Sequence, residues 1–146
     1  MQASVFGMMG LFQRKKGIGA AFSTFVRSFL DAHPQEADKL LDLYVLGTSG
    51  TSDDDEAFVN ILRFATDIGY RASAHTLAST FHGQTYLLQF AEPNPWDGPF
   101  KGYTTHVLDV AFFFQNYNDF LSSSQIVTAE NFADDVIRFA NEDAPI

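Results

Sequence analysis

Apolar residues recur at helical spacing along most of this chain, and this periodicity limits the folds open to it. Phe22, Phe25, Val26, Phe29 and Leu30 follow one another at intervals of three and four residues, as on one face of an amphipathic helix. Similar spacing predicts four helices before residue 82 and one more near the end of the sequence. With 146 residues, the chain can bury the core of a single domain.

Capping and breaking residues predict where several of these helices begin and end. Pro34 suits the first position of a helix, where its missing N–H costs nothing. Asp53 and Glu56 form a capping pair that starts the next helix, and Gly69 can close it. Thr128 is the predicted N-cap of the last helix.

One segment, Thr85–Phe90, has the composition of a short strand. Its apolar residues occupy both alternating positions, which predicts burial on both faces, as in a parallel sheet. No second strand is evident, so this strand would need sheet neighbours that the chain does not encode. The sequence therefore predicts an α/β fold, mostly helical with at least one buried strand. Its exposed edge would favour self-association.

A histidine follows this strand candidate after a loop broken by prolines. The loop Glu92–Pro99 would lie at the carboxyl end of the strand, where ligands and catalytic loops gather in open α/β sheets. His106 comes next and is the candidate functional residue, the alternative being a structural or solvated histidine. Asp109 is expected to make a local loop contact. Phe112–Phe114 is either a core segment or a partner surface.

The stretch Gly102–Phe114 resembles the catalytic-histidine segment of type-B carboxylesterases, the cholinesterase-like branch of the α/β-hydrolases. Phe139-Ala140, followed by Pro145, is similar to the close of a late helix in that family. The resemblance is firm from Thr85 to Pro145. It implies that residues 1–146 are the C-terminal part of an α/β-hydrolase domain and that His106 is the catalytic histidine.

The other members of the catalytic triad are missing or altered under this resemblance. The family order is serine, acid, histidine, so the serine elbow would lie upstream of this chain. The nearest match, Gly47–Thr51, lacks the second glycine of Gly-x-Ser-x-Gly. Gln2–Phe6 is similar to the acid motif, with Gln2 in the acid position. In a serine protease, loss of that charge lowers turnover about 10⁴-fold.

Three interpretations follow from these observations. The first is a truncated carboxylesterase-like protein of a serine ester hydrolase family, which acts on carboxylic esters without a cofactor and would be inactive in this form. The second is a non-catalytic binding or interaction module derived from an esterase, with the sheet edge as its contact. The third is a small helical protein whose resemblance to the family is accidental.

Composition removes several other classes of function. The net charge of −9 argues against nucleic acid as a partner, because phosphate binding needs a cationic surface. Without cysteine the chain has no disulfide or thiolate zinc site, and His33, His75 and His82 lack metal-ligand spacing. No metal or cofactor is expected. We also expect no membrane span and no signal peptide, so a soluble cytoplasmic protein is the default.

Overall fold

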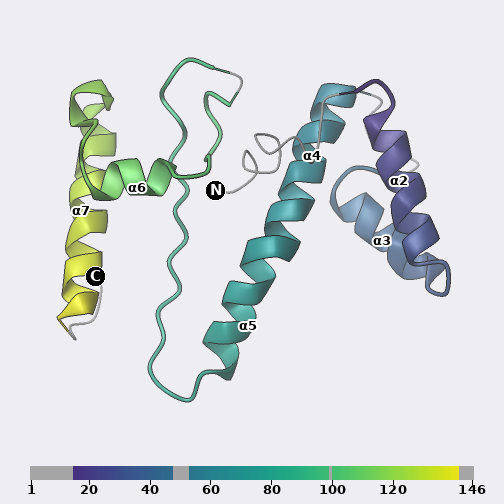
Figure 1. The fold of residues 1–146 in the computed structure, drawn as a ribbon, viewed down its shortest axis with the longest axis horizontal. Helices are drawn as coiled ribbons and strands as arrows, with labels where there is room; N and C mark the ends of the chain where they lie inside the picture. Colours follow the sequence, from purple (N-terminus) through teal and green to yellow (C-terminus); the bar gives the residue numbers. More distant parts are fainter. Residues whose placement is uncertain (1–14, 48–52, 99, 142–146) are drawn as a thin grey trace. The chain divides into compact units, whose positions relative to one another are not determined.

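The computed structural model describes residues 15–47, 53–98 and 100–141. The chain forms two compact units. Among the described residues, the N-terminal unit ends at Ser73 and the C-terminal unit begins at Ala74. Every regular element in the described residues is a helix, as Figure 1 shows, and no strand occurs among them.

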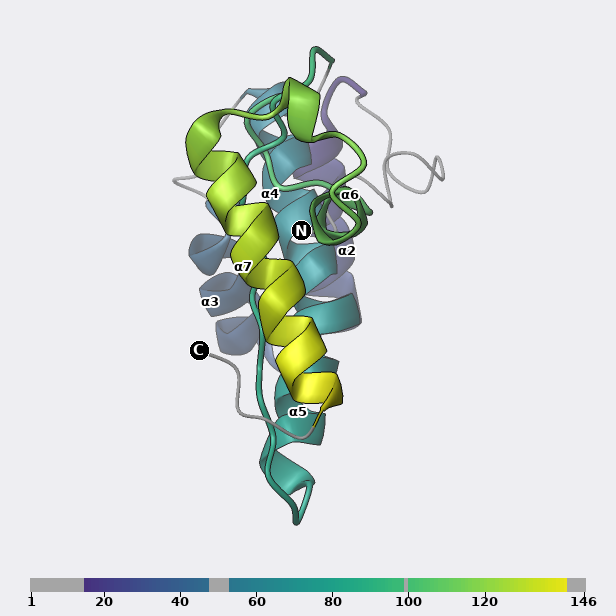
Figure 2. The same cartoon turned by 90° about the vertical axis from the view of Figure 1, so that its left-hand side faces the viewer.

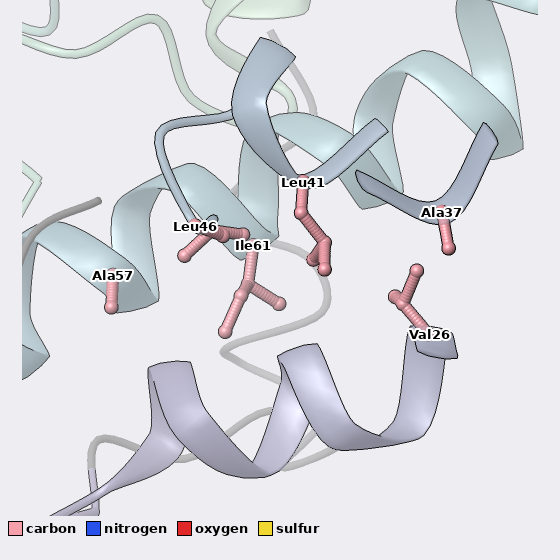
Figure 3. Close-up of a cluster of buried hydrophobic side chains, with 6 residues drawn as sticks. All are labelled: Val26, Ala37, Leu41, Leu46, Ala57 and Ile61. Carbon is pink, nitrogen blue, oxygen red and sulfur yellow. The ribbon is translucent and has the colours of Figure 1, made fainter. Parts of the chain in front are cut away.

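Three α-helices pack together in the described part of the N-terminal unit: α2 (Ile18–Phe29), α3 (Pro34–Leu43) and α4 (Asp54–Thr66). Their apolar faces meet in one buried cluster, in which the side chains point toward one another between the helices (Figure 3). The cluster consists of Val26, Ala37, Leu41, Leu46, Ala57 and Ile61. Burial of this apolar surface is the main stabilising contribution to the unit.

Helix α2 buries only part of the stripe that its sequence predicts. Val26 is buried, but Phe25 and Phe29 are 62% and 77% exposed. Their rings stack on each other, with centroids 6.1 Å apart. Gly19 lies on the side of α2 that faces α4, where a Cβ would lie 3.0 Å from the Cβ of Ala57. The absence of a side chain at Gly19 therefore allows the two helices to approach closely.

The helix starts of this unit agree with the capping residues, whereas the predicted stop at Gly69 is wrong. Pro34 is the first residue of α3. Asp53 caps α4 and accepts a hydrogen bond of 2.8 Å from the N–H of Asp55. Beyond α4 the chain continues into a π-helical turn, η1 (Asp67–Arg71), which contains Gly69. Glycine closes a helix only in a suitable left-handed geometry, and here the helical path simply widens.

The C-terminal unit is organised by two helices, α6 (Leu108–Phe113) and α7 (Ser123–Ala140). Helix α6 runs across α7 in Figure 1 and is seen nearly end-on in Figure 2. A short 3-10 turn, η2 (Asn118–Phe120), joins them. A second buried cluster lies here and consists of Phe90, Leu108, Phe112 and Ala129, with Trp96, Leu121 and Phe132 packed against it. Helix α5 (Ala72–Thr80) has no buried residue.

The predicted strand at Thr85–Phe90 is wrong. The segment is irregular, and Tyr86, Leu87 and Leu88 are exposed. Only Phe90 is buried, with its ring 5.1 Å from that of Phe112. An apolar run of this length does not specify a strand by itself. Here the segment is an irregular loop that is anchored by the ring of Phe90 against residues of α6 and α7.

The absence of strands in the described part of the chain contradicts the predicted α/β fold class, and with it the predicted partial α/β-hydrolase domain. It also removes the predicted sheet edge, and with it the basis for self-association along that edge. Mostly helical architecture was expected, and the helices are what the structure contains. The third interpretation, a small helical protein, is the one whose fold class agrees with these residues.

Candidate binding pocket

The C-terminal unit contains an open pocket of about 730 Å³ beside α6. Its lining comes from the turn before α6, from α6 itself, from the loop that leads into η2 and from one upstream tryptophan. These residues are Trp96, Thr105, His106, Val107, Leu108, Val110, Ala111, Phe114, Asn116, Tyr117 and Phe120. The volume lies in the range of small-ligand sites, which are also concave and mainly apolar.

Trp96 is held in a loop with its own hydrogen bonds. The N–H of Asn94 donates to the carbonyl of Tyr103 at 3.0 Å, and the N–H of Gly102 donates to the carbonyl of Asn94 at 2.9 Å. The Asn94 side chain accepts a further bond of 2.9 Å from the N–H of Trp96. Gly102 has φ +83°, which glycine adopts without strain. The indole ring then meets the Tyr117 ring edge-on, with centroids 5.5 Å apart.

A salt bridge across the same loop adds to its order. Lys101 Nζ lies 2.7 Å from a carboxylate oxygen of Asp97. This hydrogen bond, together with the positive charge of Lys101, lowers the pKa of Asp97 below its usual range. The Asp97 side chain is almost fully exposed, so the pair contributes little to stability.

The start of α7 fixes the base of this loop. The predicted N-cap Thr128 is wrong: Ser122 caps α7, and Gln125 completes a capping box with it. Gln125 Oε1 accepts the N–H of Ser122 at 3.2 Å, while Gln125 Nε2 donates to the carbonyl of Pro93 at 3.1 Å. One buried side chain therefore both begins the helix and ties down the loop that carries Trp96. Thr128 donates to Glu92 at 3.3 Å.

His106 lies in the turn that precedes α6, with its side chain exposed at the pocket. The N–H of Leu108 closes this turn onto the carbonyl of Thr105 at 3.4 Å. Val107 caps α6 at φ +67°, a left-handed conformation that is rare for a β-branched residue. The loop position of His106 agrees with its sequence context, although no strand precedes the loop. Asp109 is in the first turn of α6, and Gln2 lies outside the described residues.

The three consecutive phenylalanines divide between core and surface, so each of the two alternatives describes part of the segment. Phe112 is fully buried, and Phe113 packs on Phe132 with ring centroids 5.9 Å apart. Phe114 is 61% exposed and lines the pocket. Tyr117 and Phe120, also exposed, extend this apolar lining.

Sequence reasoning did not single out Val110, Tyr117 or Phe120 as site residues. Val110 lies in a helix of only six residues and Phe120 in a 3-10 turn of three, so the usual periodicity test has too few turns to separate a buried face from an exposed one. The available indication was composition, since aromatic residues crowd the stretch from 112 to 120.

Two other kinds of functional feature are absent from the described ranges. Within them, His, Asp and Glu side chains do not gather in groups of three or more that could hold a metal ion. Among the same residues, no helix combines the length and apolarity needed to cross a bilayer.

Comparison of the chain with protein-family models, with curated proteins and with solved structures gives no match in any of the three. The carboxylesterase resemblance therefore stays a prediction.

Proposed function

We propose that the chain is a binding module whose C-terminal unit takes up an apolar group of a ligand or partner in the pocket beside α6. The observation that carries this proposal is the exposure of large apolar side chains around one concavity. Val107, Phe114, Tyr117 and Phe120 are each between 48% and 67% exposed, and all of them line it. Exposed apolar surface gathered in this way marks interaction sites in soluble proteins.

Polar groups in the same lining would orient what binds there. His106, Asn116 and the hydroxyl of Tyr117 can offer hydrogen bonds next to the aromatic surface. A largely apolar pocket with a few polar groups favours recognition of a group that is apolar over most of its area and polar at one end.

This proposal develops the binding-module interpretation and replaces its contact surface. The predicted sheet edge does not exist in the described residues, so the pocket beside α6 is proposed as the contact surface instead. The ester hydrolase interpretation depends on a fold that the described residues do not have. The geometry supplies a loop histidine but gives that interpretation no further support.

Trp96 makes the proposal measurable, because it is the single tryptophan of the chain and it lines the pocket. We expect the neutral apolar probe N-phenylnaphthylamine to quench Trp96 emission by energy transfer, with saturation at one site. Phe120→Ser should weaken this binding about tenfold or more, since a buried aromatic contact contributes roughly 1.5–3 kcal/mol.

Phe29→Ser is the matched control, because Phe29 is a comparably exposed phenylalanine on α2 in the N-terminal unit. It should leave probe binding unchanged. The proposal is wrong if the probe does not bind saturably, or if the two serine variants weaken binding equally.

A further inference from the structure

Charge is distributed unevenly between the two units. The described residues of the C-terminal unit carry seven carboxylates against two basic side chains, a net charge of −5. Those of the N-terminal unit carry nine carboxylates against six basic side chains, a net charge of −3. The C-terminal unit therefore has far fewer cations to offset its acids.

Both basic side chains of the described C-terminal unit already have acidic partners. Lys101 pairs with Asp97 at 2.7 Å, and Arg138 pairs with Asp134 at 3.1 Å. The described residues of this unit thus carry five more carboxylates than cations, and their acids include Asp109 and Asp119. A negative potential over this unit follows, and the low dielectric of an apolar pocket concentrates such a field.

Two of these acids belong to the segment that forms the pocket. Asp109 stands in the chain between the lining residues Leu108 and Val110, and the exposed Asp119 precedes Phe120. The stretch from 104 to 120 contains no lysine or arginine. Along this stretch of the chain, the apolar lining residues thus alternate with acidic residues and with no lysine or arginine.

We propose that the pocket's partner is a basic amphipathic peptide segment of another protein, with apolar anchors and lysine or arginine side chains alternating on it. This inference rests on the proposed binding function. The apolar anchors would fill the aromatic pocket, as when an amphipathic helix occupies an apolar groove. The cations would meet the carboxylates of the unit, which raises the association rate and disfavours acidic competitors.

Three synthetic peptides separate the two components of this recognition. One is a short amphipathic helix of leucine and lysine, the second replaces each lysine by glutamate, and the third keeps lysine but replaces each leucine by serine. Binding is followed by Trp96 emission, since none of the peptides contains an aromatic residue. We expect the lysine–leucine peptide to bind at least about tenfold more tightly than either of the others. Its affinity should fall as salt rises above about 0.1 M, where the Debye length is about 10 Å.

A variant in which two carboxylates are neutralised tests whether the acids of the pocket segment attract the basic peptide. Asp109→Asn with Asp119→Asn should weaken the lysine–leucine peptide several-fold and leave N-phenylnaphthylamine binding unchanged. Asp31→Asn with Glu36→Gln removes the same charge from the N-terminal unit and should leave both affinities near those of the wild type. Melting temperatures of the two variants verify that each remains folded.

The outcomes distinguish this inference from the function on which it rests. If neither the probe nor any peptide changes Trp96 emission, the binding function itself is wrong. If the probe binds but the lysine and glutamate peptides bind alike, or both double variants weaken the lysine peptide equally, the function stands and the basic partner is refuted.

Discussion

A β-branched residue in a left-handed conformation is costly, and Val45 occupies one at the end of α3 with φ +57°. The helix closes there by two characteristic bonds, from Val45 N–H to the carbonyl of Asp42 at 3.1 Å and from Leu46 N–H to that of Leu41 at 2.7 Å. Glycine usually fills this position. The left-handed conformation is held in place because Leu46 and Leu41, which the closing bond joins, both belong to the buried cluster.

Val45→Gly should therefore stabilise the N-terminal unit. Relief of the left-handed strain gains about 1–2 kcal/mol, and the greater freedom of glycine when unfolded takes back about 0.5–1 kcal/mol. We expect the free energy of unfolding, from urea denaturation, to rise by about 1 kcal/mol. Val45→Ala keeps the Cβ and should gain less. Equal effects of the two substitutions would show that φ strain is not the cause.

Tyr44 makes the stability of the N-terminal unit depend on pH in the alkaline range. Its hydroxyl donates to Asp67 at 2.8 Å, and Arg71 pairs with the same carboxylate at 3.3 Å. Burial, followed by the hydrogen bond to Asp67, raises the pKa of Tyr44 to about 12. The unfolded chain loses this proton near pH 10. Between those values the folded state binds more protons, so stability is complete below pH 10 and declines as pH rises toward 12.

We expect the free energy of unfolding to fall more steeply with pH in wild type than in Tyr44→Phe over this alkaline window. Tyr103→Phe, which removes a tyrosine exposed on the other unit, is the control and should keep the wild-type slope. Parallel slopes for wild type and Tyr44→Phe would rule out the Tyr44–Asp67 contact as their source.

At the scale of elements, α7 and the loop before α6 depend on each other through Gln125. Gln125→Ala removes half of the capping box and the bond to Pro93. A lost cap costs about 1 kcal/mol, and a lost buried hydrogen bond costs a similar amount. We expect a loss of about 1–2 kcal/mol in unfolding free energy, with altered Trp96 emission in the folded protein.

Glu130→Ala, an exposed change further along α7, should cost no more than about 0.5 kcal/mol and leave Trp96 emission unchanged. A Gln125→Ala protein with wild-type emission would mean that the loop holds Trp96 without this link.

Elements with several turns and clear caps could be predicted from the sequence, and short or irregular ones could not. Pro34 and Asp53 mark their helix starts because capping depends on a few adjacent residues. The strand prediction for Thr85–Phe90 was wrong because the apolar residues of this segment fit both a strand and a loop anchored by one aromatic ring. Which of the two forms depends on neighbours distant in the sequence, here Phe112 and Phe132.

Only part of the candidate site could be predicted from the sequence, because the rest also depends on contacts between residues that are distant in the sequence. The loop position of His106 follows from the prolines before it. The pocket itself depends on Trp96 meeting Tyr117, and no local pattern indicates a contact between rings twenty-one positions apart in the sequence. The resemblance to an esterase supplied a role for His106 but not the aromatic surface beside it.

At the scale of the whole molecule, two helical units with separate cores carry different surfaces. The N-terminal unit has the lower net negative charge, and the C-terminal unit combines stronger negative charge with the aromatic pocket. The proposed binding role is assigned to the C-terminal unit, so we expect substitutions in the N-terminal unit to change stability without changing ligand affinity.

The central claim is that apolar groups bind at the pocket beside α6. Backbone amide NMR during titration with N-phenylnaphthylamine tests it most directly. We expect saturable shifts concentrated at Trp96 and from Thr105 to Phe120, with little change in α2, α3 and α4. Shifts centred on the exposed Phe25 and Phe29 of α2, or no saturable shifts, would contradict it.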